Sequence, residues 1–284
     1  MSESALAQKH PEEVIVLRPS RGWSALNLSD LWRYRELIFF LTWRDILVRY
    51  KQTVLGASWA IIQPLINMIV LSVIFGSFAK MSTAGIPRPI FTFAALLPWG
   101  LFSKALSDAG RSILANRSMI TKIYFPRLII PLSSVLGGVV DFGIQLIILI
   151  LMMIYYRILP TPAVWLLPLF ILLSLITALG FGLWLSALNA LYRDVGHILP
   201  VLTQLWLLIS PVGYSAQDVV PAQWQLVYAL NPMVGVVEGF RWALLGTAPP
   251  STTMLVASAA ISIGLLVTGM YYFRRMERIF ADVV

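Results

Sequence analysis

The sequence contains no cysteine and few charged residues. Only 12% of its 284 residues are Asp, Glu, Lys or Arg, whereas 58% are hydrophobic. A water-soluble globule of this size would need more charged surface, so the composition favours a membrane protein. The absence of cysteine excludes disulfides and thiolate metal sites, and the two histidines are too few for a histidine-rich metal site.

Motifs for nucleotide binding and hydrolysis are also missing. The chain has no Gly-Lys dipeptide, which excludes a Walker A loop, and it has neither a His-Glu-x-x-His nor a Gly-x-Ser-x-Gly motif. We therefore expect no catalytic residue, metal or bound cofactor in this chain. If ATP drives its activity, a separate subunit must bind ATP and Mg.

Apolar windows recur along the chain after a charged segment. Residues 44–64 read RDILVRYKQTVLGASWAIIQP, in which a basic cluster passes directly into the first window. The windows cover residues 54–78, 90–108, 128–155, 164–191, 198–214 and 252–273. A crossing needs about 20 helical residues at about 1.5 Å each, so four windows are long enough and the second and fifth are marginal.

These windows predict an all-α polytopic membrane protein. We expect a cytosolic tail at 1–29, an imperfectly amphipathic interfacial helix at 30–51, and a transmembrane domain over 30–284 with six spans. Residues 215–249 hold two apolar pieces around Asn231-Pro232, each too short to span, which favours short re-entrant helices before the sixth span. Gly137-Gly138 in the third window predicts a close helix approach.

The basic residues indicate the orientation. With residues before Val54 in the cytosol and six spans, sixteen of the 21 Lys and Arg fall on the cytosolic side, as the positive-inside rule requires. A seventh crossing at 219–245 would place the C-terminal arginines outside. We therefore expect both termini in the cytosol. The first fifty residues lack the pattern of a cleavable signal peptide, so the first internal span would act as the membrane signal. The net charge of +8 is spread over short clusters and does not indicate nucleic acid.

Ionisable residues inside the windows predict ion pairs. Lys104 and Asp108 are four residues apart, and Glu238 and Arg241 are three apart, so each pair can meet on one helix face. Asp141 has no cation on its own helix. It would be expected to form an interhelical hydrogen bond or to lie in a wet cavity, with a relay role as a weaker alternative.

The aromatic residues and the cytosolic loops leave alternatives open. Tryptophans at window ends are typical interface anchors, whereas Trp59, Trp184 and Trp206 inside windows could line a passage and stack on sugar rings. Residues 111–124 and the turn at 192–197 are either charged loops that set the topology or short helices against a cytosolic motor. The cluster of Arg44, Arg49 and Lys51 either binds a lipid diphosphate or simply holds anionic headgroups.

The chain resembles a known family in the order and spacing of many short motifs. It is similar to the permease subunits of ABC-2 type exporters, in particular the bacterial branch that exports O antigen, capsule and teichoic acid. The matching residues, which span about 30–284, are Arg44-Asp45, Arg49-Tyr50-Lys51, Gly56, Trp59, Gln63-Pro64, Leu97-Pro98-Trp99, Asn116, Phe125-Pro126, Tyr192-Arg193-Asp194, Asn231-Pro232-Met233, Glu277 and Phe280-Ala281-Asp282.

The resemblance implies a homodimer in the bacterial inner membrane with two copies of a separate ATPase subunit, which would bind ATP and Mg. The segment 111–124 would be a coupling helix in a cleft of the ATPase, and the region near Arg193 a second contact. The residues that would take part in ATPase coupling are Arg111, Ser112, Asn116, Lys122, Tyr124, Arg193 and Asp194. Membrane lipids would surround the chain.

The function implied is ATP-driven export of a polyprenyl-diphosphate-linked polysaccharide, most simply O antigen. Two alternatives are kept. One is an ABC-2 permease for a drug or small lipid. Neighbouring glycosyltransferase genes would favour polysaccharide export, whereas a neighbouring resistance cassette would favour this alternative. The other is a membrane enzyme acting on a polyprenyl lipid, which the scattered acidic residues of the loops disfavour.

Overall fold

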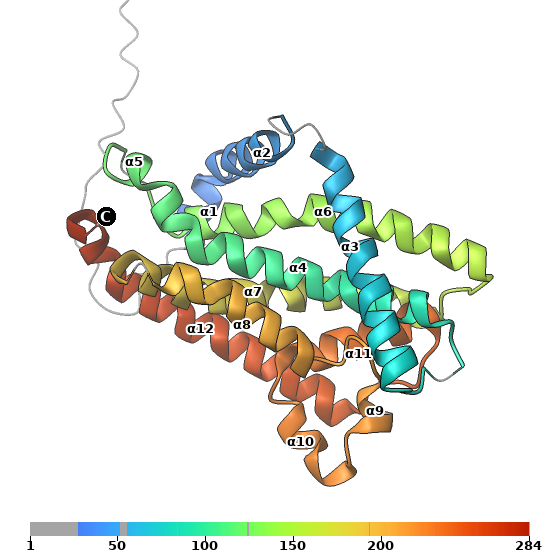
Figure 1. Cartoon of the computed structure of the whole chain (residues 1–284). Coiled ribbons are helices and arrows are strands. Elements are labelled where there is room, and N and C mark those ends of the chain that lie inside the picture. The colour runs from blue at the N-terminus through green and yellow to red at the C-terminus, as the bar shows by residue number, and fades with distance from the viewer. Residues whose placement is uncertain (1–27, 52–55, 84, 124, 193, 284) are drawn as a thin grey trace, which may run out of the picture.

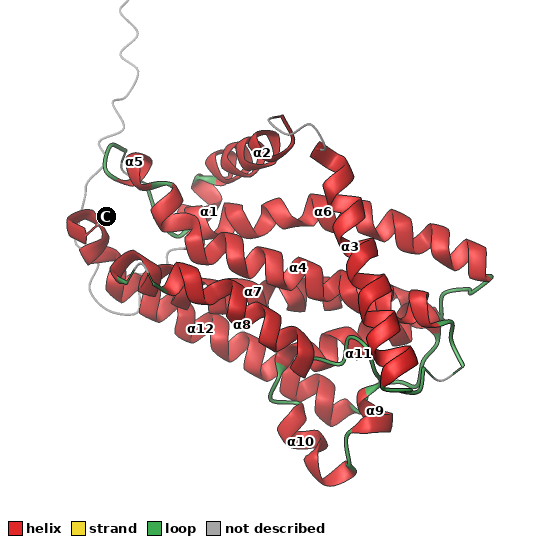
Figure 2. Cartoon of the chain, in the orientation of Figure 1, coloured by secondary structure: helices red, strands yellow, loops and turns green. Residues whose placement is uncertain are grey.

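The chain folds into helices joined by short loops. The computed structural model describes residues 28–283 apart from 52–55, 84, 124 and 193, and in that part of the chain Figure 2 shows helices and no strand. The all-α prediction is confirmed. The expected tail at 1–29 lies almost entirely outside the described residues, and so do Tyr124 and Arg193.

The elements follow one another as a series of long helices with shorter pieces between them. In chain order they are α1 Leu28–Arg33, α2 Arg35–Lys51, α3 Gly56–Val73, η2 Ile74–Phe78, α4 Arg88–Ala115, α5 Arg117–Ile120, α6 Ile129–Tyr156, η3 Pro162–Leu166, α7 Leu167–Leu191, α8 Val195–Ile209, α9 Ala216–Val219, η4 Ala222–Trp224, α10 Gln225–Tyr228, α11 Pro232–Leu245 and α12 Thr252–Val283. The expected interfacial helix at 30–51 is thus α1 and α2, which begin two residues earlier and are separated at Tyr34.

Five helical stretches of the described residues are long and apolar enough to cross a bilayer, and α8 is a shorter apolar helix. The five cover residues 58–78, 88–115, 129–156, 162–191 and 252–277. The 15 residues of α8 rise about 22 Å, less than the roughly 30 Å of a hydrocarbon core. The fold is therefore that of a polytopic membrane protein, and the fifth predicted window is the one with a short helix.

Helix α4 is the centre of the bundle. It packs most extensively against α7 and α6 and also contacts α11 and α3 (Figure 1). Of its apolar window 78% is buried, compared with 6% for the window that contains α3. An inner helix surrounded by protein can carry Lys104, Asp108 and an internal Pro98, which is why its apolar window looks shorter than the helix.

Helices α7 and α12 approach each other closely at Gly180. A Cβ placed on Gly180 would lie 2.7 Å from the backbone nitrogen of Leu266, so only glycine fits there. A Cβ on Gly137 would have no atom of another residue within 4 Å, and one on Gly138 would make an ordinary contact. The predicted close approach at Gly137-Gly138 is wrong, because a glycine permits close packing without specifying that a neighbour is present.

The segment between α8 and α12 consists of short elements and one buried helix. Its first part is divided among α9, η4 and α10, whereas its second part is the continuous helix α11. The side chain of Asn231 caps α11 by accepting a hydrogen bond from the Met233 N–H at 3.1 Å, and Pro232 occupies the first helical position. Nearly all of α11 is buried, which suits a non-spanning helix covered by protein.

One end of the bundle carries α5 together with α1 and the end of α12 (Figure 1), and we call it the α5 end. An apolar cluster joins these elements there, with Leu41 of α2, Ile120 of α5 and Phe280 of α12 all buried. Both ends of the described chain are thus held at the same end of the bundle. Helix α2 itself lies along α6.

Candidate functional site

A polar pocket of about 520 Å³ lies between α2 and the junction of α4 with α5. Three arginines and two aspartates line it with hydroxyl and amide groups; the lining residues are Arg44, Asp45, Val48, Arg49, Asp108, Arg111, Ser112, Ala115, Asn116, Ser118, Met119 and Ser134. The pocket brings together residues that the sequence assigns to two different roles. Two of them belong to the proposed headgroup cluster, and three are proposed coupling residues.

Arg44 connects α2 to the end of α4. Its guanidinium is ion-paired with Asp45 at 2.7 Å, and its Nη2 also donates to Asn116 Oδ1 at 2.8 Å. The Asn116 amide in turn donates to the backbone carbonyl of Ser112 at 2.9 Å. The coupling segment therefore begins at a helix end that is fixed to α2 by a charge-assisted hydrogen bond.

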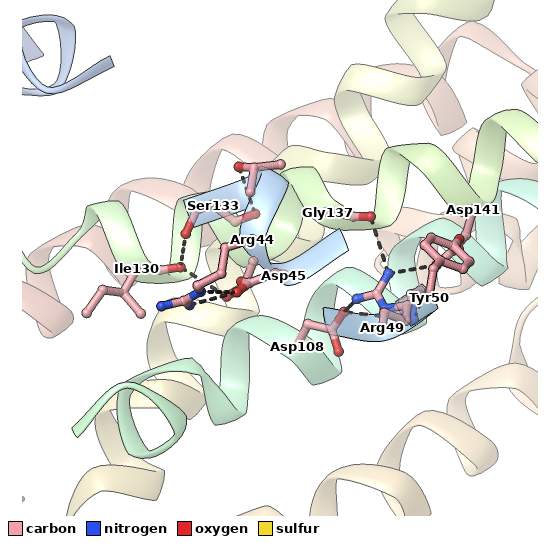
Figure 3. Close-up of polar contacts among 12 residues, drawn as sticks. Arg44, Asp45, Arg49, Tyr50, Asp108, Ile130, Ser133, Gly137 and Asp141 are labelled. Carbon is pink, nitrogen blue, oxygen red and sulfur yellow. Dashed lines mark hydrogen bonds and ion pairs between the residues drawn. The ribbon is translucent and has the colours of Figure 1, made fainter. Parts of the chain in front are cut away.

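Arg49 connects the last turn of α2 to two helices at once. Its Nη1 lies 2.9 Å from Asp141 Oδ2 on α6, and its Nη2 lies 3.0 Å from Asp108 Oδ2 on α4 (Figure 3). Figure 3 shows the guanidinium between the two carboxylates, close to the Gly137 carbonyl. The planar fork of an arginine suits this bridging position, because its N–H groups point at both acids together.

Lys104 is a second cation in the same place. Its ammonium lies 3.3 Å from Asp141 and 4.0 Å from Asp108, so the predicted pair on α4 is confirmed, although Asp141 is the nearer partner. We name Arg49, Lys104, Asp108 and Asp141 the Arg49 cluster. Its two cations balance its two carboxylates, and only 8% of the Asp141 side chain is exposed. The cluster is therefore a neutral polar site within the bundle.

Tyr50 completes the set of partners of Asp141 by donating its hydroxyl to the carboxylate. Burial and this hydrogen bond raise the pKa of Tyr50 to about 12, so the hydroxyl keeps its proton and remains a donor at neutral pH. Asp141 thus binds two residues of α2, as well as Lys104. The expectation that Asp141 forms an interhelical bond is confirmed.

The remaining described headgroup and coupling residues lie on the surface. Lys51 and Lys122 are exposed, and Asp194 is exposed just before α8. Arg111 donates to the Gly196 carbonyl at 3.1 Å and so joins the end of α4 to the first turn of α8. The predicted coupling helix at 111–124 is divided, because its first five residues continue α4 and only Arg117–Ile120 form α5.

The three candidate passage tryptophans lie in different surroundings. Trp59 of α3 is 53% exposed. Trp184 of α7 stacks on Tyr272 of α12, with ring centroids 4.2 Å apart, above an apolar groove of about 380 Å³. Trp206 of α8 packs edge-on against aromatic side chains of α4 and α7 and donates to Asn231 Oδ1 at 3.0 Å. The structure does not bring the three together within one chain.

A second buried ion pair holds α11 in place. Arg241 and Glu238, which the sequence pairs, lie 3.6 Å apart with 0% and 2% of their side chains exposed. Glu238 also accepts from the Ala216 N–H at 2.8 Å, and Arg241 donates to the Tyr214 carbonyl and stacks over Phe91. The pair therefore connects α11 to the turn after α8 and to α4. This prediction is confirmed.

Sequence reasoning missed the partners of Arg49. One signal was available: an acidic residue in an apolar window with no cation on its own helix must find one elsewhere, and Arg49 lies in a basic cluster at a membrane boundary. The identity of that cation depends on how α2 lies on α6, which no local pattern encodes. Within the described residues, no three His, Asp or Glu side chains gather closely enough to hold a metal ion.

Together these features define a multi-pass membrane protein with a polar pocket, at its α5 end, between an amphipathic helix and the end of its central helix. The family model described as "ABC-2 type transporter" matches residues 36–245, which include the pocket, the Arg49 cluster and α11. The chain belongs to the ABC-2 type transporter family.

Several characterised proteins are similar over most of the chain. An "O-antigen export system permease protein RfbA" of Myxococcus xanthus is 30% identical over 259 residues, which are 90% of this chain and 98% of that protein. A protein of the same name from Klebsiella pneumoniae is 26% identical over 88% of this chain and 95% of its own length. The "Polysialic acid transport protein KpsM" of Escherichia coli is 25% identical over 82% of this chain and 91% of its own length.

Proposed function

We propose that this chain is the permease subunit of an ATP-driven exporter that carries a polyprenyl-diphosphate-linked polysaccharide, most simply O antigen, across the bacterial inner membrane. The similarity to RfbA of Myxococcus xanthus over nearly its whole length carries the proposal, because that protein is named for O-antigen export. Relatives named for polysialic acid and capsule export also favour a polysaccharide over a drug or small lipid.

A separate ATPase subunit would supply the energy, because the chain has no nucleotide-binding motif. The α5 end offers the surface for it. There α5, the exposed Lys122 and the first turn of α8 lie beside the polar pocket. The described start and end of the chain are both at this end, which supports cytosolic termini (Figure 1). ATP and Mg would be bound by the partner, in two copies per homodimer.

A second copy of the chain would complete the passage. The window containing α3 is only 6% buried, and α8 exposes Val201, Leu205 and Leu208. One chain leaves both of these faces uncovered, which supports a homodimer with the polysaccharide passing between the two copies. Trp59 on the exposed face of α3 would be available to stack on sugar rings there.

The lipid diphosphate would be bound from the cytosolic leaflet by Arg44 and Arg49, which line the polar pocket, and by Lys51 at the end of α2. Charge-assisted bonds from arginine to phosphate are short and strong, and the pocket volume of about 520 Å³ leaves space for such a group. Replacing Arg49 and Lys51 together by Gln should reduce export without preventing assembly with the ATPase. Lys51→Gln alone separates loss of headgroup binding from disruption of the Arg49 cluster, because Lys51 is exposed and lies outside that cluster.

Deletion of the gene tests the function. We expect the deletion strain to lose surface polysaccharide and to accumulate the undecaprenyl-linked intermediate inside the cell, and a plasmid copy to restore both. Unchanged surface polysaccharide together with altered sensitivity to a drug would contradict the proposal and support the alternative. Catalysis on a polyprenyl lipid by the purified chain alone would support the membrane enzyme.

A further inference from the structure

Helix α2 lies along α6 but buries little of its own surface. Leu41 is the only side chain of α2 recorded as buried, and Phe39, Phe40, Trp43 and Val48 are more than half exposed. Leu41 enters the apolar cluster at the α5 end, which holds the first half of the helix. In its last turn, Arg49 bonds to Asp108 of α4 and to Asp141 of α6, and Tyr50 also bonds to Asp141.

The Arg49 cluster has one cation, Lys104, that does not come from α2. Arg49 comes from α2, whereas Lys104, Asp108 and Asp141 belong to α4 and α6, which pack together in the bundle. If Arg49 withdrew, Lys104 would still lie 3.3 Å from Asp141 and 4.0 Å from Asp108. The buried carboxylate would therefore not lose all its countercharge, which is the main penalty of breaking a buried ion pair.

We propose that the Arg49 cluster is a releasable attachment: Arg49 holds the end of α2 against α4 and α6, and Lys104 retains the two carboxylates when Arg49 leaves. The cause of the release rests on the proposed function, in which an ATPase presses on the α5 end. The attachment itself is a property of this chain alone. Lys104, Asp108 and Asp141 are then positioning residues, which act on export through the position of α2.

The proposal explains why the bridging residue is an arginine and the retained cation a lysine. The guanidinium of Arg49 contacts a carboxylate on each of two helices and so fixes α2 in one position. The ammonium of Lys104 is a compact charge on a flexible stem, and it can move between Asp141 and Asp108 as the carboxylates lose Arg49. Release of α2 therefore leaves one negative charge of the cluster unbalanced, but both acids stay near the Lys104 ammonium.

Spin labels can follow the release, because the natural chain has no cysteine. Val48 of α2 and Ala115 at the end of α4 are both exposed and both line the pocket, so a Val48→Cys/Ala115→Cys pair reports the distance across it. The labelled chain is assembled with unlabelled ATPase in lipid nanodiscs and diluted with unlabelled chain. Pulsed EPR distances are then recorded without nucleotide and with ATP trapped by vanadate.

We expect one narrow distance without nucleotide and a second, longer distance after trapping. Arg49→Gln should raise the fraction of the longer distance without nucleotide by roughly tenfold. This corresponds to a change of about 1.4 kcal/mol in the free-energy difference between the two positions of α2. Lys104→Met should keep the short distance in both states and should lower export. Arg35→Gln is the matched control, since it removes one positive charge from an exposed position of the same helix and should behave as the unsubstituted pair.

Two results would overturn the proposal. An unchanged narrow distance in Arg49→Gln would mean that the cluster does not hold α2, and an ATP-dependent shift that persists in Lys104→Met would mean that Lys104 is not needed for release. If Arg49→Gln fails to assemble, Arg49→Lys replaces it. Because one ammonium cannot bridge both acids, this variant should show both distances without nucleotide. A single short distance would contradict the proposal. The nucleotide-free measurements need no polysaccharide, so failure of the export function would leave them interpretable.

Discussion

Arg49 and Asp141 form an ion pair of 2.9 Å although they are 92 positions apart in the sequence. The pair joins the last turn of the amphipathic helix α2 to the middle of α6, and Asp108 on α4 shares the same guanidinium. An arginine at a membrane boundary is commonly explained by topology and anionic lipid. Here its position is determined by two carboxylates inside the bundle.

The two carboxylates of the Arg49 cluster should differ in their contribution to stability. Asp141 is 8% exposed and Asp108 is 33% exposed. We expect Asp141→Asn to lower the free energy of unfolding by about 3 kcal/mol, because two cations then share one acid inside the bundle. Asp108→Asn should cost about 1 kcal/mol, as for a partly solvated pair. Unfolding in mixed SDS micelles measures both, and equal losses would contradict this ranking.

Removing one charge of the buried Glu238–Arg241 pair should destabilise the protein more than removing both charges together. Arg241→Met leaves Glu238 as an uncompensated buried charge, and we expect it to lower the free energy of unfolding by about 3–5 kcal/mol. The double variant Glu238→Gln/Arg241→Met removes both charges and should recover part of this loss. The same SDS titration compares them. A double variant no more stable than Arg241→Met would show that the charge imbalance is not the cause.

Gly180 should not tolerate even a methyl group. A Cβ there meets the backbone of α12 at Leu265 and Leu266, which cannot move as a flexible side chain would. We expect Gly180→Ala to lower the free energy of unfolding by about 1–3 kcal/mol through overpacking. Gly143→Ala on α6 is the control, since no atom of another helix lies within 4 Å of its Cβ position. Comparable losses in the two variants would contradict the close packing of α7 and α12.

The passage tryptophans should separate into structural and exposed classes. Trp206→Phe removes the donor to Asn231 Oδ1, which also caps α11, and should cost about 1 kcal/mol of stability. Trp59→Ala should leave stability nearly unchanged because the side chain is 53% exposed, yet lower export if sugar rings stack on it. Thermal unfolding followed by tryptophan fluorescence and quantification of surface polysaccharide measure these effects. Normal export by Trp59→Ala would exclude its role in the passage.

Local patterns predicted the helices and their short-range pairs. The apolar windows locate every described helix that is long enough to span a bilayer, because a bilayer imposes a minimum length on apolar sequence. Lys104–Asp108 and Glu238–Arg241 follow from the helical period, which brings residues three and four apart to one face. The central helix α4 was predicted too short, because an apolar window ends where polar residues begin. Polar residues at its end, such as Asp108 and Arg111, are supported by neighbouring helices that a single window does not contain.

By itself, the sequence determined that this is an all-α membrane protein without a Walker A motif, with a charged, imperfectly amphipathic helix before its first span. Only the tertiary structure decided that Arg49 binds Asp141 and Asp108, that Gly180 rather than Gly137 packs against another helix, and that Trp206 is held by Asn231. The physical reason is the range of the interactions. Length, hydropathy and helical period act over neighbouring residues, whereas pairing between helices depends on their rotation and depth, which the packing of the whole bundle sets.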